Sequence, residues 1–195
     1  MLKRQFHRIR LPHLYYNDGI YFVTYRLKGS ISPGELEKFQ IIIRETKGEN
    51  SDVKIFNKYD ALIENKNNKI DYLRKSEIAE ICKHSLHFPD GKDYTLICYC
   101  IMPNHSHVVF ELINRNKSVG GIMGAIKRNS AKEANKVLNR SGPFWQAESF
   151  DRLVRDDKEL YFVIKYVLLN PVNAGLATDW NEWKYTYCHP DYLVL

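Results

Sequence analysis

The stretch DYTLICYCIMPNHSHVVFELI, residues 93–113, decides the fold of this chain. Two runs of apolar, β-branched and aromatic residues flank the dipeptide Pro103-Asn104, which interrupts regular structure. Runs so close in the sequence predict two antiparallel strands joined as a hairpin. Within the second run, His105 and His107 are two residues apart, so on a strand both side chains project from one face. The stretch therefore predicts a sheet that carries a pair of imidazoles.

Further strands and helices are predicted on either side of this hairpin. Runs of β-branched and aromatic residues indicate strands, and apolar residues spaced three or four apart indicate helices. The predicted strands are residues 19–29 and 142–154, and the predicted helices are residues 32–46, 76–88, 118–139 and 156–170, the last ended by Asn170-Pro171. The fold class expected from this order is α+β, with helices packed on an antiparallel sheet.

The chain is expected to form one domain over residues 1–195, since this length supports one sizeable core. Residues 47–73 are polar and poorly periodic, which indicates an insertion or a flexible connection. An aromatic C-terminal tail from about residue 178 is expected to pack back on the domain. The N-terminal residues contain no long apolar run, so neither a signal peptide nor a membrane span is expected. Four cysteines without a disulfide spacing add to the expectation of a reduced, cytoplasmic protein.

Positive charge is concentrated in two parts of the sequence. The chain has 29 Lys and Arg against 23 Asp and Glu, a net charge of +6. Residues 115–140 hold seven cations and a single acid, and residues 1–30 hold six cations and a single acid. Two basic segments in a balanced remainder favour a polyanionic partner such as nucleic acid. Solvated helix faces would produce the same pattern, so charge alone leaves both interpretations open.

Two kinds of metal site are compatible with the hairpin. Neutral imidazoles bind divalent metals well, and a pair fixed on one strand provides two ligands. A third ligand has to come from elsewhere, and Glu133 is the single acid of the second basic segment, although it could instead pair with Lys136 or Arg128. Alternatively, Cys98 and Cys100 could join the histidines in a structural zinc site. Both cysteines could also be small buried strand residues, and the histidines could face solvent.

Four segments occur in the order and spacing of the REP-associated tyrosine transposases, which belong to the HUH single-strand transposase superfamily. They are YFVTYRLKG, MPNHSHVVFEL, IMGAIKRNSAKEANKVLNRSGPFWQAESFDRLVR and YVLLNPVNAGL, and they span nearly the whole chain. The combination of MPNHxH, GPFWQ and NPVNAG is specific, and through it the chain resembles this family. The resemblance implies a ferredoxin-like sheet with helices on one face. It also implies a Mg²⁺ or Mn²⁺ ion, and single-stranded or hairpin DNA that is cut by a tyrosine on a long helix.

The resemblance also implies roles for individual residues. The family's histidine pair falls on His105 and His107, as metal ligands. Its third ligand, a polar residue one turn after the nucleophile, falls on Glu133. The nucleophile itself falls on Asn129, where relatives have a tyrosine. An amide is too poor a nucleophile to form a phosphotyrosine-like bond, so the resemblance implies that the catalytic position has changed here.

Several residues are expected to contact DNA if the resemblance holds. Cationic side chains near the nucleophile position would neutralise phosphates, and aromatic side chains would stack on bases. The expected contacts are Lys127, Arg128, Lys132, Lys136, Arg26 and Trp145, with Tyr25 and Phe144 as further stacking surfaces. For the aromatic side chains, the alternative is packing in the core.

The function expected from the sequence is metal-assisted DNA strand cleavage and rejoining through a phosphotyrosine intermediate, impaired here by Asn129. Tyr161 and Tyr166 lie on the following predicted helix and are interpreted as structural rather than as replacement nucleophiles. The alternative function is a non-catalytic, domesticated DNA-binding module with a vestigial histidine pair. The sequence leaves the oligomeric state open between a monomer and a homodimer.

Overall fold

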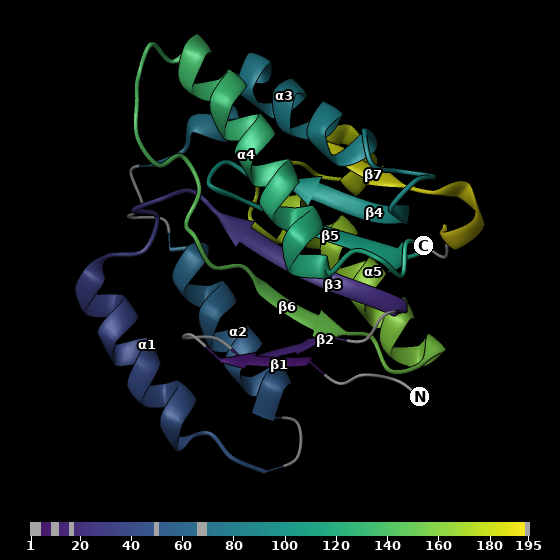
Figure 1. The fold of residues 1–195 in the computed structure, drawn as a ribbon. Helices are drawn as coiled ribbons and strands as arrows, with labels where there is room; N and C mark the ends of the chain where they lie inside the picture. The colour runs from purple at the N-terminus through teal and green to yellow at the C-terminus, as the bar shows by residue number, and fades with distance from the viewer. Residues whose placement is uncertain (1–4, 9–11, 16–17, 49–50, 66–69, 194–195) are drawn as a thin grey trace.

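A five-stranded antiparallel sheet forms the centre of the molecule (Figure 1). The structure is a computed structural model, and it describes residues 5–8, 12–15, 18–48, 51–65 and 70–193. The strand order of the sheet is β6-β3-β5-β4-β7. Its strands are β3 (Gly19–Arg26), β4 (Tyr94–Ile101), β5 (His105–Leu112), β6 (Phe150–Leu153) and β7 (Thr186–Cys188). A separate two-stranded sheet pairs β1 (Gln5–Arg8) with β2 (Pro12–Tyr15).

The order of the strands confirms the expected fold class. β4 and β5 form the predicted hairpin, and β3 pairs with β5 on one side and β6 on the other. Helix α3 (Ser76–His87) precedes β4, and helix α4 (Val119–Val137) lies between β5 and β6. Strands β3 to β6 with these two helices form the β-α-β-β-α-β arrangement of a ferredoxin-like fold. β7 extends the sheet beside β4.

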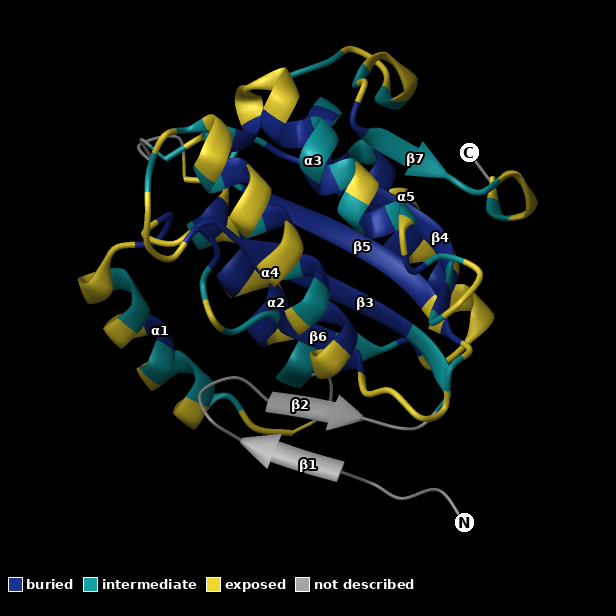
Figure 2. Cartoon of the chain, turned by 45° about the horizontal axis from the view of Figure 1, so that its top comes forward, coloured by how far each residue is buried: buried dark blue, intermediate teal, exposed yellow. Residues whose placement is uncertain are grey.

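Helices cover both faces of the sheet, so the expectation of helices on one face is wrong. α3 and α4 lie on one face, and α2 (Ser51–Ile63) and α5 (Asp157–Asn173) lie on the other. Helix α1 (Pro33–Glu45) packs against α2. Figure 2 shows β3, β4 and β5 as mostly buried strands, whereas β7 at the edge of the sheet is of intermediate burial. Three short 3-10 helices complete the described chain: η1 (Tyr72–Arg74), η2 (Trp180–Glu182) and η3 (Pro190–Tyr192).

Side chains of β3 alternate between two separate cores. Tyr21, Val23 and Tyr25 enter the core under α3 and α4, whereas Phe22 enters the core under α2 and α5. A strand buried on both faces has little need for polar residues, and this explains why β3 reads as an almost continuous apolar run. The same alternation along β5 directs both histidines toward α2 and α5.

The polar segment 47–73 contains a helix that packs in the core. Four side chains of α2 are buried at helical spacing: Ile55, Phe56, Tyr59 and Ile63. Polar and charged residues separate these positions, and they give the segment its low mean hydropathy. The interpretation of this segment as a flexible connection is therefore wrong for residues 51–63.

Two predicted boundaries differ from those of the structure. Of the segment predicted as a strand over residues 142–154, the structure forms a strand at β6, Phe150–Leu153, near its C-terminal end. Helix α5 continues beyond Asn170 with Pro171 inside it, rather than ending there. Pro171 removes a single backbone N–H close to the end of the helix, and Ala174 N still donates to Asn170 O at 3.0 Å. Asn170 therefore remains helical, one turn after Tyr166.

The aromatic C-terminal tail packs on the sheet. β7 pairs with β4, the indole Nε1 of Trp183 donates to the carbonyl of Ile101 at 2.9 Å, and Tyr185 is buried.

Within the described residues, no helix is both long and apolar enough to cross a membrane.

Candidate metal centre

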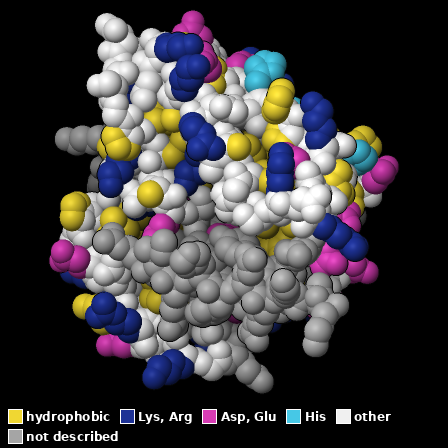
Figure 3. Space-filling view, in the orientation of Figure 1, with side chains coloured by type: hydrophobic (Ala, Val, Ile, Leu, Met, Phe, Trp, Pro, Cys, Tyr) yellow, Lys and Arg dark blue, Asp and Glu magenta, His cyan; other side chains and the backbone are white. Residues whose placement is uncertain are grey.

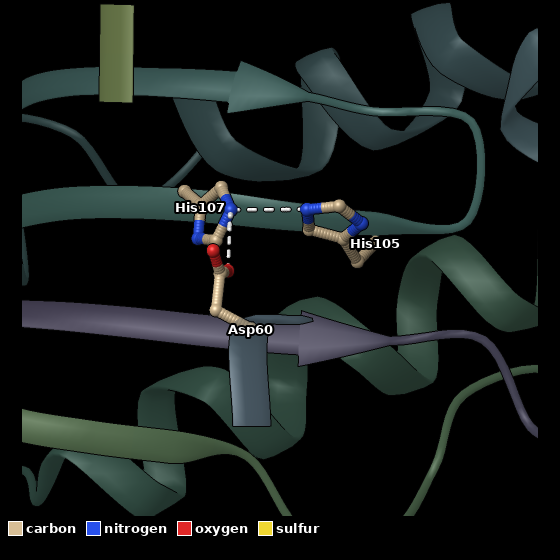
Figure 4. A group of neighbouring side chains, drawn as sticks. All are labelled: Asp60, His105 and His107. Atoms are coloured by element: carbon tan, nitrogen blue, oxygen red, sulfur yellow. Dashed lines mark hydrogen bonds and ion pairs between the residues drawn. The ribbon is translucent and has the colours of Figure 1, made fainter. Parts of the chain in front are cut away.

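The two histidines project from β5 as a pair, as the sequence predicts (Figure 4). Their Nε2 atoms lie 3.0 Å apart, and both side chains are buried. The His107 ring stacks on Phe22 with ring centroids 5.7 Å apart, which places it in the core under α2 and α5. Burial lowers the pKa of His105 to about 3 and lowers that of His107 as well. Both imidazoles are therefore neutral at pH 7, the state in which they bind metals.

The protonation of His105 follows from its neighbours. Asn104 Nδ2 donates to the carbonyl of Ile63 at 2.9 Å, and this bond turns its Oδ1 toward His105 Nδ1 at 2.6 Å. An amide oxygen only accepts, so Nδ1 of His105 carries the proton. A neutral imidazole has one proton, and Nε2 of His105 therefore presents a lone pair toward His107. Orientation of a ligand histidine by its second nitrogen is typical of metal sites.

The proton of His107 can lie on either ring nitrogen, and one of these two arrangements suits a bound metal. Its Nδ1 lies 2.7 Å from Thr24 Oγ1, and a hydroxyl can donate to that nitrogen or accept from it. When the hydroxyl donates, Nε2 of His107 carries the proton and can donate to His105. When the hydroxyl accepts, both Nε2 atoms present lone pairs, and two lone pairs 3.0 Å apart require a cation between them or beside them.

Asp60 of α2 completes a three-residue group with the histidines. One ligand atom from each of Asp60, His105 and His107 lies within 4.8 Å of the others. Asp60 Oδ1 is 3.7 Å from His107 Nε2 (Figure 4). Burial raises the pKa of Asp60, a hydrogen bond with Tyr166 opposes the rise and the nearby Glu64 adds to it, and the resulting pKa is about 7. A buried carboxylate is costly unless it is paired with a cation or coordinates a metal.

Tyr166 and Asn170 approach the same histidine from α5. The hydroxyl of Tyr166 lies 3.4 Å from His107 Nε2, and Asn170 Nδ2 is also 3.4 Å from that nitrogen. The two side chains are four residues apart on one helix, and Asn170 Nδ2 donates to Tyr166 Oη at 3.2 Å. A second bond from Nδ2, also 3.2 Å long, reaches Glu64 Oε1. Burial and the nearby Asp60 raise the pKa of Tyr166 above its usual value, so its hydroxyl is protonated.

The residues around His107 fit a divalent metal ion. Asp60 Oδ1 and Asn170 Oδ1 are buried oxygens without a hydrogen-bond partner among the described residues. Such oxygens are costly unless they are paired or coordinate a metal. A half-turn of the Asn170 amide would direct Oδ1 toward His107 Nε2, where Nδ2 now lies. Two imidazoles with a carboxylate and an amide oxygen form a donor set that suits divalent first-row metals.

The structure does not bring Glu133 or Asn129 to the histidine pair. Both lie on α4 and are exposed, on the opposite face of the sheet from His105 and His107. Both carboxylate oxygens of Glu133 accept from Lys136 Nζ at 2.9 Å, the pairing that the sequence offered as its alternative role. Because the sheet separates α4 from the histidines, Glu133 cannot ligate the same ion in this arrangement.

The cysteines do not complete a zinc site in this fold. Cys98 and Cys100 are free and buried, and burial raises the pKa of the Cys100 thiol to about 12. A thiol must lose its proton to bind zinc, so this environment opposes ligation. Within the described part of the chain, the group that could hold a metal contains Asp60 and the two histidines, and no cysteine.

The residues expected to contact DNA divide into exposed and buried ones. Arg128, Lys132 and Lys136 are exposed on α4. Lys127 donates to Ala147 O and Ser149 Oγ, and burial lowers its pKa to about 8. Figure 3 shows Lys and Arg side chains spread over this side of the molecule rather than gathered in one patch.

The remaining expected contacts lie in the core. Arg26 is 1% exposed and donates to Ser30 Oγ at 3.1 Å. Trp145 is buried, packs edge-on against Tyr25 and donates from Nε1 to Ser130 Oγ at 2.9 Å. Tyr25 and Phe144 are buried as well. In this conformation none of these four side chains is available to a DNA strand.

The chain belongs to the IS200-like transposase family. The family's sequence model, described as "Transposase IS200 like", matches residues 61–168, a range that includes the histidine pair and Tyr166. Transposases of this kind form a class of DNA-cleaving and DNA-joining enzymes. The match covers His105, His107 and Tyr166, whereas Asp60 and Asn170 lie just outside its two ends.

Two similar proteins carry the name of one group within this family. A REP-associated tyrosine transposase of Haemophilus influenzae is 26% identical over 132 residues, which cover 62% of this chain and 71% of that protein. A solved structure of a REP-associated tyrosine transposase bound to a REP hairpin has a TM-score of 0.54 and 13% identity, and the alignment covers 93% of this chain and 81% of that one. This second likeness shows the shared fold.

Proposed function

We propose that this chain cleaves and rejoins single-stranded DNA with Tyr166 as its nucleophile. The observation that carries the proposal is the 3.4 Å approach of the Tyr166 hydroxyl to His107 Nε2. The family's third metal ligand is expected one turn after the nucleophile, and Asn170 has that relation to Tyr166. Asn129 is then an exposed residue of α4 without a catalytic role. Its identity no longer implies that the nucleophile is missing.

A divalent ion, Mg²⁺ or Mn²⁺, would be held by His105 and His107 together with Asp60 or Asn170. When bound, it supplies a Lewis acid that polarises the scissile phosphate. The chain's own part is to hold its ligands in place, through the hydrogen bonds that His105 Nδ1 donates to Asn104 and that His107 Nδ1 donates to Thr24. Zn²⁺ and Fe²⁺ also suit two imidazoles and a carboxylate, so the metal should be varied experimentally.

The covalent step is an exchange of ester bonds at phosphorus. A bond forms between Tyr166 Oη and the phosphorus, the bond from phosphorus to the 3′ oxygen breaks, and the departing strand takes up a proton to become a 3′-OH. The phenol has to lose its proton during the attack. Asp60 is a side-chain hydrogen-bond partner of Tyr166, and its carboxylate is positioned to accept that proton. Attack by a 3′-OH on the phosphotyrosine reverses the step and rejoins DNA.

The DNA partner is proposed to be a hairpin with a single-stranded extension, as the resemblance implies. Arg128, Lys132 and Lys136 are exposed on one face of α4 and would contact backbone phosphates. The sheet separates these side chains from Tyr166, so they would hold a part of the DNA other than the scissile phosphate. We place this reaction in the cytoplasm, performed by a monomer or a homodimer.

A covalent-adduct assay tests the proposal. Labelled single-stranded hairpin DNA is incubated with the protein and Mn²⁺, Mg²⁺, Zn²⁺ or EDTA, and adducts are resolved on a denaturing gel. The wild type should form an adduct with at least one metal and none in EDTA, and Tyr166→Phe should form none. The matched control is Tyr161→Phe, which alters an exposed tyrosine of the same helix and should leave the adduct unchanged.

Binding without any adduct, in every metal, would instead support the non-catalytic DNA-binding module. The sequence motivated that alternative by the absence of a tyrosine at residue 129. The presence of Tyr166 beside His107 removes this motivation, and the assay then decides between cleavage and binding alone.

A further inference from the structure

Two cavities flank the metal centre and share no lining residue. The first, which we name the His105 cleft, has a volume of about 420 Å³ and is lined by Asn65, Ile70, Arg74, Met102, His105 and Asn173, among others. The second has a volume of about 530 Å³, and Tyr166 is one of its lining residues. The nucleophile and one of the histidines therefore open to different cavities. Both volumes lie in the range of small-molecule binding sites, about 300–1,000 Å³.

The direction of attack places the two DNA segments on either side of the scissile phosphate in different surroundings. In phosphoryl transfer the attacking and departing oxygens lie roughly in line, on opposite sides of the phosphorus. Tyr166 Oη and His105 Nε2 approach His107 Nε2 at 3.4 and 3.0 Å, respectively. A phosphate beside His107, attacked by Tyr166, would direct its departing 3′ oxygen away from Tyr166, and of the two cavities the His105 cleft is the one that Tyr166 does not line.

The chemistry of the His105 cleft suits a base better than a phosphate. Its charged lining residues are Glu64, Asp71 and Arg74, and the Arg74 guanidinium is paired with Asp71 at 3.1 Å. This balance is acidic, so it would not attract the negatively charged backbone. Amide and charged side chains hydrogen-bond the edges of bases, and apolar side chains such as Ile70 and Met102 can contact their faces.

We propose that the His105 cleft binds the nucleotide directly 5′ of the scissile phosphate, the one that departs with the 3′-OH, and reads its base. Asn173, the last residue of α5, and Arg74, of η1, are the side chains assigned to the base edge. Both are exposed at the cleft and lie outside the metal centre. The inference rests on the proposed cleavage by Tyr166 and adds where the sequence preference of cleavage arises.

A pool of hairpin oligonucleotides with a randomised single-stranded flank tests the inference. The pool is cleaved by the wild type, by Asn173→Ala, by Arg74→Ala and by Asn57→Ala, and the released 3′ ends are sequenced. Asn57 is an exposed asparagine of the second cavity and serves as the matched control. The wild type should prefer particular bases directly 5′ of the cut, and Asn173→Ala should reduce this preference by roughly tenfold, the usual loss for one base-edge contact. The control should keep it.

Three results would overturn the inference. An unchanged preference in both Asn173→Ala and Arg74→Ala would show that the cleft does not read the base, and so would a preference that changes only on the 3′ side of the cut. The absence of any adduct in the wild type would overturn the proposed function together with this inference. Adduct formation with an unchanged preference would overturn the inference alone.

A binding measurement gives a readout that does not depend on cleavage. Tyr166→Phe protein is titrated with a hairpin whose single-stranded 3′ end is 2-aminopurine, and the fluorescence of that base is followed. Entry of the terminal base into the cleft should change its fluorescence, and adding Asn173→Ala should weaken this response by roughly tenfold, whereas adding Asn57→Ala should not. A response that is insensitive to both changes would place the terminal base elsewhere.

Discussion

Replacement of Asp60 by asparagine should stabilise the metal-free protein at neutral pH and weaken its response to metal. Asp60 is buried, and its pKa rises from 3.8 to about 7 in the folded state, mainly through burial. A carboxyl with a higher pKa in the folded state holds its proton more tightly there than in the unfolded chain. The contribution of Asp60 to the free energy of unfolding therefore falls as the pH rises from about 4 to about 7.

The expected change in the free energy of unfolding follows from the size of this rise in the pKa of Asp60. An increase of the pKa from 3.8 to about 7 corresponds to about 4 kcal/mol at about 1.4 kcal/mol per pH unit, and this is an upper limit. Asparagine has nearly the same shape and no charge, so Asp60→Asn avoids this loss. For a domain of this length, 4 kcal/mol corresponds to a change in Tm of roughly 8–16 °C.

Thermal unfolding in EDTA between pH 4 and pH 8 provides the measurement. The two histidines, whose pKa values are lowered by burial, contribute alike to both proteins. Asp60→Asn should therefore gain stability relative to the wild type as the pH rises, with the difference largest at pH 8. Asp191→Asn, which alters an exposed carboxyl, should follow the wild type. Mn²⁺ at a hundred times its Kd should then add about 2.7 kcal/mol to the wild type and less to Asp60→Asn. Parallel pH profiles for wild type and Asp60→Asn would refute this reasoning.

Two further perturbations test other parts of the structure. Replacing Arg128, Lys132 and Lys136 together by alanine should reduce the dependence of hairpin binding on salt, lowering the slope of log K against log salt by about 2 to 3 if each contacts one phosphate; an unchanged slope would remove α4 from the DNA interface. Ser130→Ala should cost about 1–3 kcal/mol and lower Tm, because it leaves the buried Trp145 Nε1 without its acceptor; an unchanged Tm would show that the indole finds another partner.

The sequence predicted the sheet well because the evidence for it is local. The hairpin is indicated by two apolar runs around Pro103-Asn104, and the period of a strand directs His105 and His107 to one face. The start of the helix predicted over residues 32–46 is also local, since Ser32 and Glu35 form both hydrogen bonds of the capping box of α1. Such features depend on a few neighbouring residues, and tertiary contacts did not alter them.

The proposed nucleophile, Tyr166, and the proposed third ligand are harder to predict from sequence because they depend on which helix covers which face of the sheet. Two helices follow the histidine pair, and nothing local distinguishes α4 from α5 as its partner. The resemblance implies a nucleophile position on the first of these helices, at Asn129. The spacing of Tyr166 and Asn170, four residues apart, was the available signal, but Asn170-Pro171 was interpreted as the end of the helix. Asp60 lies in the polar segment 47–73, for which the sequence predicts an insertion or a flexible connection and no functional residue.

Identification of the residue bound to DNA tests the central claim most directly. The adduct is trimmed with nuclease and digested with trypsin, which cuts after Lys158 and Lys165 and so separates Tyr161 from Tyr166. Mass spectrometry should find the nucleotide on the peptide that spans residues 166–184, attached to Tyr166. Attachment to Tyr161, or to any residue outside this peptide, would contradict the assignment of the nucleophile and with it the active site described here.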